Sequence, residues 1–287
     1  MKSLQASQML NFILFNFLFL SIGCNNEKAN KLPNISNNTV VSKIDTIDKI
    51  DTVRKIISTE ITCDTTKKYI YLTFDDGPQN GTVACVDVCK KLGVKATFFM
   101  VSNHASSPLL KQIVKSIKES YPQILLANHS STHANGKYHF FYQHSEMAAE
   151  DFYLAQKKLD VPFKIIRLPG NTSWVTEGKL RANNLTKPVC QLLDSAGYNV
   201  IGWDLEWNFN HKNANPKESA ETMIKRVDSY LEKNSLNTPN HLVILTHDRM
   251  FRNQNYTDSL YKFIAALQQN KNYVLETLDH YPNLKKL

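Results

Sequence analysis

The feature that most constrains the fold is the alternation of short apolar runs with longer amphipathic stretches from residue 67 onward. Seven apolar runs have the length of strands: 69–74, 95–101, 123–127, 163–167, 198–203, 241–246 and 273–278. Helix-like stretches lie between them: 82–92, 107–119, 145–158, 187–196, 216–233 and 257–270. Such alternation predicts parallel βαβ units, and nearly continuous apolar runs are typical of strands covered on both faces. We therefore expect an α/β fold, arranged as a closed barrel or as an open doubly wound sheet.

Five of the apolar runs lead directly into a polar cluster. The clusters are Thr73–Pro78, His129–His133, Arg167–Gly170, Trp203–Trp207 and Leu245–Asp248. In barrels of parallel strands the chemistry lies where strands end and loops begin. This shared position predicts that Asp75, His129, Arg167, Asp204 and His247 meet at one rim and form a single site.

Two of the clusters contain the side chains that a divalent metal needs. Asp75 and Asp76 precede a Gly-Pro turn signal, and adjacent residues leaving a strand point in different directions. One carboxylate can therefore bind a metal while its neighbour faces a water molecule. His129 and His133 are four residues apart, so one helical turn or a tight loop can present both to one ion. With Asp76 they complete a two-histidine, one-carboxylate set; the alternative is a solvated turn and a chance histidine pair.

The remaining clusters predict groups that assist catalysis. Arg167 can pair with a carboxylate and hold it ionised, although a purely structural pair is the alternative. Gly170 lets its backbone N–H approach a ligand closely, as an oxyanion-stabilising donor must. His247 at a strand end suits a general acid, oriented by an adjacent carboxylate such as Asp204; the alternative is a rim histidine bonded to a loop.

Three tryptophans lie near the expected rim. Trp174, Trp203 and Trp207 could form an apolar wall against a sugar ring or an acetyl methyl group. Ordinary packing is the alternative for aromatic residues in this position.

The first 24 residues predict export and a lipid anchor. Lys2 is followed by an apolar stretch, 9–22, which is too short for a comfortable membrane span and suits the core of a secretory signal. Small residues then precede Cys24, which resembles a bacterial lipoprotein signal in which this cysteine is lipidated. We expect a bacterial cell-envelope protein anchored to the membrane through Cys24; a plain signal peptide or an uncleaved anchor is the alternative.

Residues 25–66 separate this segment from the expected domain, 67–287. They are polar and contain no aromatic residue, which predicts a flexible linker. The net charge of +8 is spread along the chain without a Lys/Arg-rich run, so nucleic-acid binding is not predicted, and no feature predicts a protein partner. The cysteines beyond Cys24 are expected to be buried free thiols, with a bridge from Cys63 as the alternative.

The clusters resemble those of the polysaccharide deacetylases of carbohydrate esterase family 4, the NodB homology domain, over roughly residues 67–280. The most specific elements are Thr-Phe-Asp-Asp-Gly-Pro at 73–78 and His-Ser-x-x-His at 129–133, supported by 96–99 and 245–247. The resemblance implies a deformed, TIM-like seven-stranded (β/α) barrel. It also implies removal of acetyl groups from N-acetylglucosamine polymers or O-acetylated xylan with zinc, or with cobalt, manganese or nickel.

Carried over residue by residue, the resemblance assigns each group a role. Asp75 becomes the general base, Arg167 orients it, and His247 becomes the general acid. The metal ligands become Asp76, His129 and His133.

The chain departs from the family pattern at two motifs. The third motif usually has an aromatic residue after its proline, whereas Gly170 and Asn171 follow here. In the fourth motif the acid and tryptophan are spaced differently, so that Asp204 and Glu206 both remain candidates for the supporting acid. The substrate groove and this acid are therefore expected to differ from the usual arrangement.

These observations predict an exported, metal-dependent deacetylase of acetylated carbohydrates. An O-acetyl esterase acting on xylan-like glycans is an alternative, because ester and amide cleavage share this machinery. A non-catalytic glycan-binding module on the same fold is the other. Asp75, Arg167 and His247 argue against it, since a pure binder needs no acid–base pair.

Replacing Cys24 with Ala is expected to release a soluble or uncleaved form, because the attachment point for the lipid is lost. Membrane fractionation with immunoblotting checks this. A Cys24→Ala protein that still sediments with membranes at its processed size would refute the lipoprotein hypothesis.

Overall fold

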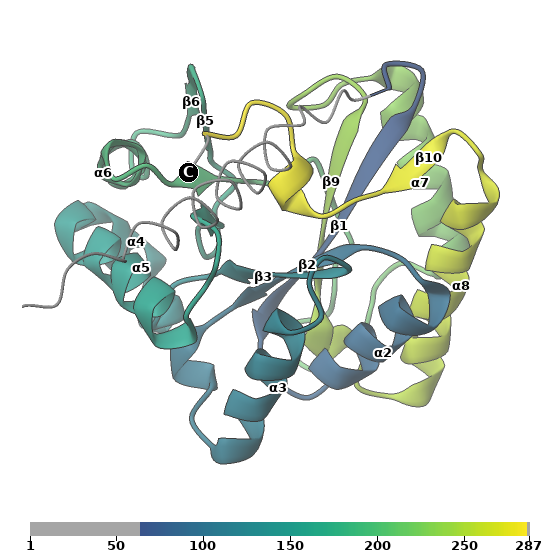
Figure 1. Ribbon diagram of the computed structural model, residues 1–287, viewed down its shortest axis with the longest axis horizontal. Helices are drawn as coiled ribbons and strands as arrows, with labels where there is room; N and C mark the ends of the chain where they lie inside the picture. Colours follow the sequence, from purple (N-terminus) through teal and green to yellow (C-terminus); the bar gives the residue numbers. More distant parts are fainter. Residues whose placement is uncertain (1–63, 286–287) are drawn as a thin grey trace, which may run out of the picture. The chain divides into compact units, whose positions relative to one another are not determined.

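The computed structural model describes residues 64–285, and the expected signal segment and nearly all of the linker lie outside this range. The described residues form one curled sheet with helices packed around it (Figure 1). Its strands run in the order β6 (Lys179–Arg181), β5 (Trp174–Thr176), β7 (Asn199–Val200), β4 (Ile165–Ile166), β3 (Ile124–Asn128), β2 (Ala96–Met100), β1 (Lys68–Gly77), β9 (His241–His247) and β8 (Leu205–Glu206). β10 (Tyr273–Leu275) pairs with the beginning of β1.

Most of the strand pairs are parallel, as the alternating pattern predicts. Among the strands of residues 64–285, the antiparallel pairs are those of β5 with β6 and with β7. No pairing within 64–285 joins β6 to β8, so the sheet is curled but does not close. The expected α/β fold is confirmed as a deformed, open (β/α) barrel.

Each of the seven expected runs overlaps a strand, and each expected helix is present. The helices are α2 (Thr82–Leu92), α3 (Pro108–Lys118), α4 (Tyr138–Gln143), α5 (Ser145–Leu159), α6 (Lys187–Ser195), α7 (Ala220–Lys233) and α8 (Gln254–Gln269). Four short 3₁₀ turns complete the order: η1 (Ser102–His104), η2 (His133–Gly136), η3 (Asp248–Phe251) and η4 (Leu278–His280). The sequence did not predict α4, β5, β6 and β8, because segments this short do not complete a readable period.

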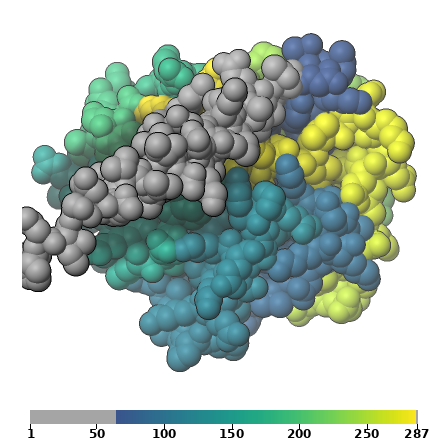
Figure 2. All heavy atoms as spheres, viewed as in Figure 1, coloured from purple at the N-terminus to yellow at the C-terminus, as the bar shows by residue number. Residues whose placement is uncertain are grey.

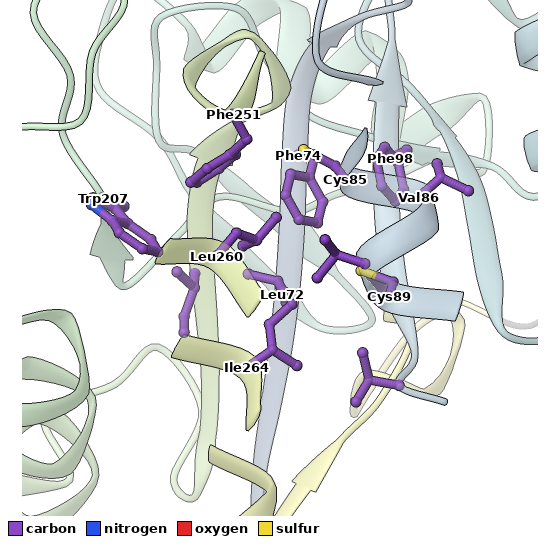
Figure 3. Packing of buried hydrophobic residues seen from close by; sticks show 14 of the residues in the cluster. Leu72, Phe74, Cys85, Val86, Cys89, Phe98, Trp207, Phe251, Leu260 and Ile264 are labelled. Carbon is purple, nitrogen blue, oxygen red and sulfur yellow. The ribbon is translucent and has the colours of Figure 1, made fainter. Parts of the chain in front are cut away.

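The side chains of β1 alternate between two buried faces. Ile70, Leu72 and Phe74 face the helices, where they join a cluster with the buried face of α2 and α8 (Figure 3). Tyr71 points to the inside of the curled sheet, and Thr73 and Asp75 follow it at the same period of two. This alternation places the polar end of β1 inside the barrel.

Helices α2 and α8 lie side by side (Figure 1), and in the space-filling view the blue atoms of the first units border the yellow atoms of the C-terminal part (Figure 2). The buried residues of both helices pack with those of β1. Cys85 and Cys89 of α2 are buried free thiols, as is Cys190 in α6, and Cys63 lies outside the described residues. Burial raises the pKa of Cys89 to about 12 and that of Cys190 to about 11. These thiols are therefore packing residues. No helix of the described part is long and apolar enough to cross a membrane.

A small charge network connects the residue after β10 to the residue before β2 and to η4. Glu276 lies 2.7 Å from the Lys95 ammonium and 2.8 Å from Nδ1 of His280. Burial by itself raises the pKa of the Glu276 carboxyl, but His280, Lys95 and the Thr277 amide outweigh it and lower this pKa to about 2. Glu276 in turn raises the pKa of His280.

Glu276→Gln is expected to lower the free energy of unfolding by about 1–2 kcal/mol at pH 6, a value reduced for solvent screening. Since the folded-state pKa lies below the ordinary value of 4.5, the contribution is present above pH 4.5 and is lost as the pH falls toward 2. Urea unfolding from pH 2.5 to 6 measures this, with Glu119→Gln, in an exposed i,i+4 pair with Lys115, as the control. A pH-independent difference would contradict the assignment.

Candidate active site

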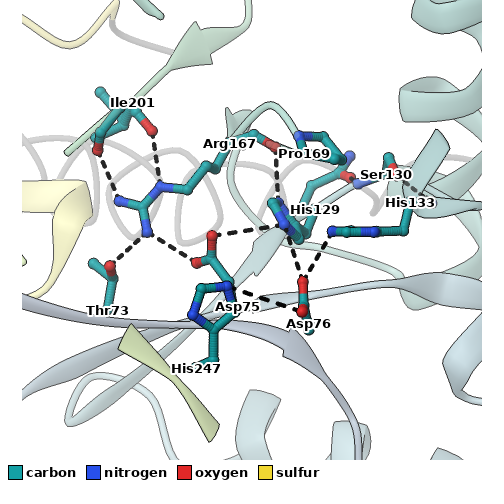
Figure 4. Close-up of polar contacts among 12 residues, drawn as sticks. Thr73, Asp75, Asp76, His129, Ser130, His133, Arg167, Pro169, Ile201 and His247 are labelled. Atoms are coloured by element: carbon teal, nitrogen blue, oxygen red, sulfur yellow. Dashed lines mark hydrogen bonds and ion pairs between the residues drawn. The ribbon is translucent and has the colours of Figure 1, made fainter. Parts of the chain in front are cut away.

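The end of β1 carries two adjacent carboxylates, and a bulge directs both into one site. Phe74 pairs with Phe98 of β2 and Gly77 with Met100, so Asp75 and Asp76 stand opposite a single residue. Adjacent residues of a regular strand point to opposite faces, and a bulge re-aims one of them. Figure 4 shows both carboxylates facing the same group of side chains.

Several residues at and near the candidate metal ligands have left-handed backbone conformations. Asp76 has φ 75° and Ser130 has φ 77°. The four residues of η2 are all left-handed, with φ values of 52°, 55°, 47° and 71° from His133 to Gly136. This conformation costs roughly 1–2 kcal/mol for an ordinary L-residue, and strain of this kind concentrates at functional sites. The loops around Asp76 and His133 are therefore shaped for positioning side chains.

Arg167, just after β4, is completely buried and holds Asp75 in place. Its Nη1 donates to Asp75 Oδ1 at 2.9 Å and also to the hydroxyl of Thr73. Its Nε and Nη2 donate to the carbonyls of Ile201 and Gly202. Four of the five N–H groups of the guanidinium thereby have acceptors, and Oδ2 of Asp75 remains directed toward Nε2 of His129 at 3.6 Å.

Asp76, His129 and His133 bring one ligand atom each within 4.8 Å of one another. Nε2 of His133 lies 2.9 Å from Asp76 Oδ1, and Nε2 of His129 lies 3.5 Å from it. Nδ1 of His129 contacts the carbonyl of Arg167 at 2.9 Å. A carbonyl only accepts, so Nδ1 carries the proton and Nε2 of the neutral ring presents a lone pair.

This donor set fits a divalent transition metal such as zinc. Asp76 Oδ1 is buried and, among the described residues, accepts no hydrogen bond of regular geometry, although Nε2 of His133 lies 2.9 Å away. A carboxylate oxygen and an imidazole nitrogen whose lone pairs face one point are placed as atoms that coordinate one cation. Two imidazoles and one carboxylate are ligands that zinc prefers, and three protein ligands leave a coordination position open. Identical chemistry also suits cobalt, nickel or manganese.

The charges of the cluster shift the pKa values of its members. Burial raises the pKa of Asp76, but contacts with His129, His133 and His247 outweigh it and hold this pKa well below its usual range. Burial lowers the pKa of His129, yet Asp75 and Asp76 leave it raised overall. Asp76 is therefore an anion in the folded protein, as a metal ligand must be.

His247, at the end of β9, faces the two carboxylates. It is the β-ladder partner of Asp75, and its Nε2 lies 3.9 Å from Asp76 Oδ2. The Phe209 ring packs edge-on against the imidazole, with centroids 4.8 Å apart. Burial lowers the pKa of His247 in spite of Asp76 and Asp75. The imidazole is thus placed to exchange a proton with a group bound above the carboxylates.

Asp204 does not lie beside His247, contrary to the expectation from the sequence. Its carboxylate accepts hydrogen bonds from the backbone N–H groups of Asn237 and Val243 at 2.7 and 2.9 Å. Val243 is four residues before His247 on β9, about 13 Å away along a strand. Burial and the charge of Asp75 raise the pKa of Glu206, so Glu206 lies within electrostatic range of the site. Asp204 therefore fixes loops at the other end of β9.

Trp174 and Trp207 are also placed differently from the expected apolar wall. Both are fully buried: Trp174 stacks on Tyr281, and Trp207 packs edge-on against Phe251 (Figure 3) and against Phe263. Neither indole can contact a substrate, because packing with the inner and outer cores encloses them. Trp203 is only partly buried and lies over the Arg167 guanidinium.

Several residues that support the site had no signal in the sequence. Nδ1 of His104 contacts the carbonyl of Asp76 at 2.6 Å. Asp151 on α5 accepts from the backbone of the loop between the two histidines, at Ser131 and Thr132. Asp248 is buried against Thr82 and Gln79. Only Asp248, adjacent to His247, lies in a cluster that sequence reasoning had singled out.

Gly170 lies on the same rim and is exposed, with φ 64°. The Tyr138 ring lies against its Cα side, 3.2–3.3 Å from where a Cβ would be. Tyr138 also contacts His133, with ring centroids 5.7 Å apart. Sequence reasoning missed this tyrosine, because α4 is too short to be predicted.

The sequence of this chain resembles those of known proteins. Residues 62–244 match the sequence model of the family described as polysaccharide deacetylase. The Bacillus subtilis protein YheN, named as a candidate polysaccharide deacetylase, is 30% identical over 192 residues, which are 63% of this chain and 58% of that protein. Chitin disaccharide deacetylase from Vibrio alginolyticus is 25% identical over 312 residues, 76% of this chain and 72% of that protein.

Solved structures share the fold. The catalytic domain of a peptidoglycan N-acetylglucosamine deacetylase from Eubacterium rectale superposes with a TM-score of 0.56 at 26% identity, covering 81% of this chain and 98% of that domain. A family 4 carbohydrate esterase from Streptomyces lividans has a TM-score of 0.53 at 20% identity, covering 76% and 97%. At 20% identity, the similarity to the Streptomyces lividans esterase shows a shared fold only.

Asp75→Asn and Asp76→Asn are expected to fail in different ways, although they are adjacent. Loss of the Asp76 carboxylate removes a ligand and should weaken zinc affinity at least tenfold, the scale of supporting groups in metal sites. Asp75→Asn should keep its zinc but lose turnover, because an amide accepts no proton. Elemental analysis and kcat of both variants measure this. Equal loss of zinc in both would contradict the division of roles.

Proposed function

The chain belongs to the polysaccharide deacetylase family, and we propose that it is a metal-dependent hydrolase that removes acetyl groups from N-acetylated, N-acetylglucosamine-type polysaccharides or oligosaccharides. The observation that carries this proposal is the convergence of two sets of groups at one rim. A buried base held by arginine, Asp75, stands beside the ligand set of Asp76, His129 and His133.

The residues support a hydrolysis with separate base and acid. A divalent ion held by Asp76, His129 and His133 would supply Lewis acidity toward an acetyl carbonyl and water, whose pKa such ions lower from about 15.7 to about 7. Oδ2 of Asp75 accepts the proton of the attacking water, while Arg167 holds Oδ1. His247 then donates a proton to the leaving nitrogen.

The base, the acid, Arg167 and Gly170 contribute to the proposed reaction in different ways. A positioned base or acid adds roughly 10²–10⁴-fold to the rate. The guanidinium of Arg167 fixes Asp75, while its Nε and Nη2 donate to backbone carbonyls. The exposed backbone of Gly170 is the proposed N–H donor to the oxyanion.

An N-acetyl substrate is supported by the names of the relatives. The Eubacterium rectale domain is named for N-acetylglucosamine in peptidoglycan, and the Vibrio enzyme for chitin disaccharide. A bifunctional xylanase/deacetylase from Pseudobutyrivibrio xylanivorans is 39% identical over 67 residues, 23% of this chain and 11% of that protein. This short match favours acetylated xylan as the second candidate substrate.

We also propose that the protein acts in the bacterial cell envelope, anchored through lipidated Cys24. This rests on the apolar stretch and the small residues before Cys24. An anchored enzyme would meet its polymeric substrate outside the cell membrane.

Acetate release by the zinc-loaded protein tests the function. We expect release from N-acetylglucosamine oligomers and little from acetylated xylan. The opposite preference would favour the esterase, and no release from either would refute the hydrolase.

In the same assay His247→Ala should lower kcat by roughly 10²-fold or more and raise KM little, because the imidazole acts in the chemical step. Its zinc content should equal that of the parent. Loss of zinc from His247→Ala would show that this histidine has another role.

A further inference from the structure

We propose that Tyr138, with Phe140, forms the stacking platform for the pyranose ring that neighbours the acetylated sugar. The inference rests on the proposed function and names the part of the substrate that this chain recognises. The ligand class is an uncharged N-acetylated pyranose, bound by its apolar face.

The position of Tyr138 relative to the ligand set is the first support. Its ring meets the His133 ring edge-on, with centroids 5.7 Å apart at 83°. Its hydroxyl lies 3.4 Å from Nδ1 of His133. A sugar ring stacked on Tyr138 would therefore lie close to His133, which contacts Asp76.

The missing side chain at Gly170 is the second support. Gly170 follows Pro169 directly and carries no side chain. The space that a side chain at Gly170 would need is filled by the Tyr138 ring, 3.2–3.3 Å from an ideal Cβ. The aromatic surface at this rim thus comes from α4 in place of the loop after Arg167.

Exposure is the third support. Tyr138 and Phe140 keep 36% and 54% of their surface exposed. They line a hollow of about 590 Å³ formed by residues 136–140, a size that suits a small ligand. The left-handed turn of η2 directly precedes them and turns the chain so that the aromatic ring returns to His133.

The side chains that line this hollow suit the apolar face of a sugar ring. The exposed parts of the Tyr138 and Phe140 rings offer apolar area with little conformational entropy to lose. The exposed Lys137 and His139 alternate with the rings, so polar groups are available for the hydroxyl edge of the pyranose.

Binding in a non-hydrolysing background tests the platform. Calorimetry would measure Kd for a tetrasaccharide of N-acetylglucosamine with zinc-loaded Asp75→Asn, alone and combined with Tyr138→Ala, Tyr138→Phe or Phe140→Ala. Tyr138→Ala should raise Kd about tenfold, Phe140→Ala about threefold, and Tyr138→Phe less than twofold, because the ring is kept. The monosaccharide should lose less affinity than the tetrasaccharide, since it has no neighbouring ring.

Tyr121→Ala is the matched control, because Tyr121 is 43% exposed and precedes β3 at the end opposite to His129. Equal Kd values for Tyr138→Ala and Tyr121→Ala would overturn the proposal, as would equal losses for the monosaccharide and the tetrasaccharide. If Tyr138→Ala unfolds, Phe140→Ala decides, because its exposed side chain contributes little to the core. Acetate release by the parent is measured separately, so a parent that binds without turnover refutes the function and leaves the platform standing.

Discussion

The buried ion pair between Arg167 and Asp75 is the interaction on which the site depends. One guanidinium donates to Asp75, Thr73 and the carbonyls of 201 and 202, and so joins β1 to the segments that follow β4 and β7. The carbonyl of the same arginine fixes the tautomer of His129. Losing one partner of such a pair leaves an uncompensated buried charge, which costs about 3–5 kcal/mol. A lysine could not replace the planar fork, because it offers one point charge.

Around this pair, the buried strands of the barrel support loops whose backbone conformations are locally unfavourable. The bulge at Asp75–Asp76 and the left-handed residues Ser130 and His133–Gly136 each give up local backbone preference. Their cost is offset by the buried strands to which they are attached and by supports such as Asp151. The result is a separation of tasks: the carboxylates and His129 come from strand ends, His133 comes from η2, and the proposed stacking surface comes from the short helix α4.

Much of the fold was predictable because it depends on periodicity. The continuous apolar runs and amphipathic stretches matched seven strands and six helices, since burial on both faces of a parallel sheet leaves a clear pattern. The residue types of the chemistry were also readable. Two acids before Gly-Pro, and two histidines four apart, indicate a metal set wherever strand ends converge. The short elements β5, β6, β8 and α4 were not predictable, because packing and not local preference holds them.

The sequence by itself determined the order of elements, the rim at which the polar clusters meet and the kinds of groups found there. Only the tertiary structure decided which groups touch. Asp204 accepts hydrogen bonds from the backbone of Asn237 and Val243 and does not contact His247. Trp174 and Trp207 lie in the cores. The Tyr138 ring occupies the space beside Gly170. The physical reason is that a side chain's partner depends on strand register, bulges and the volume left by distant residues. A local pattern records burial and period, but not those distances.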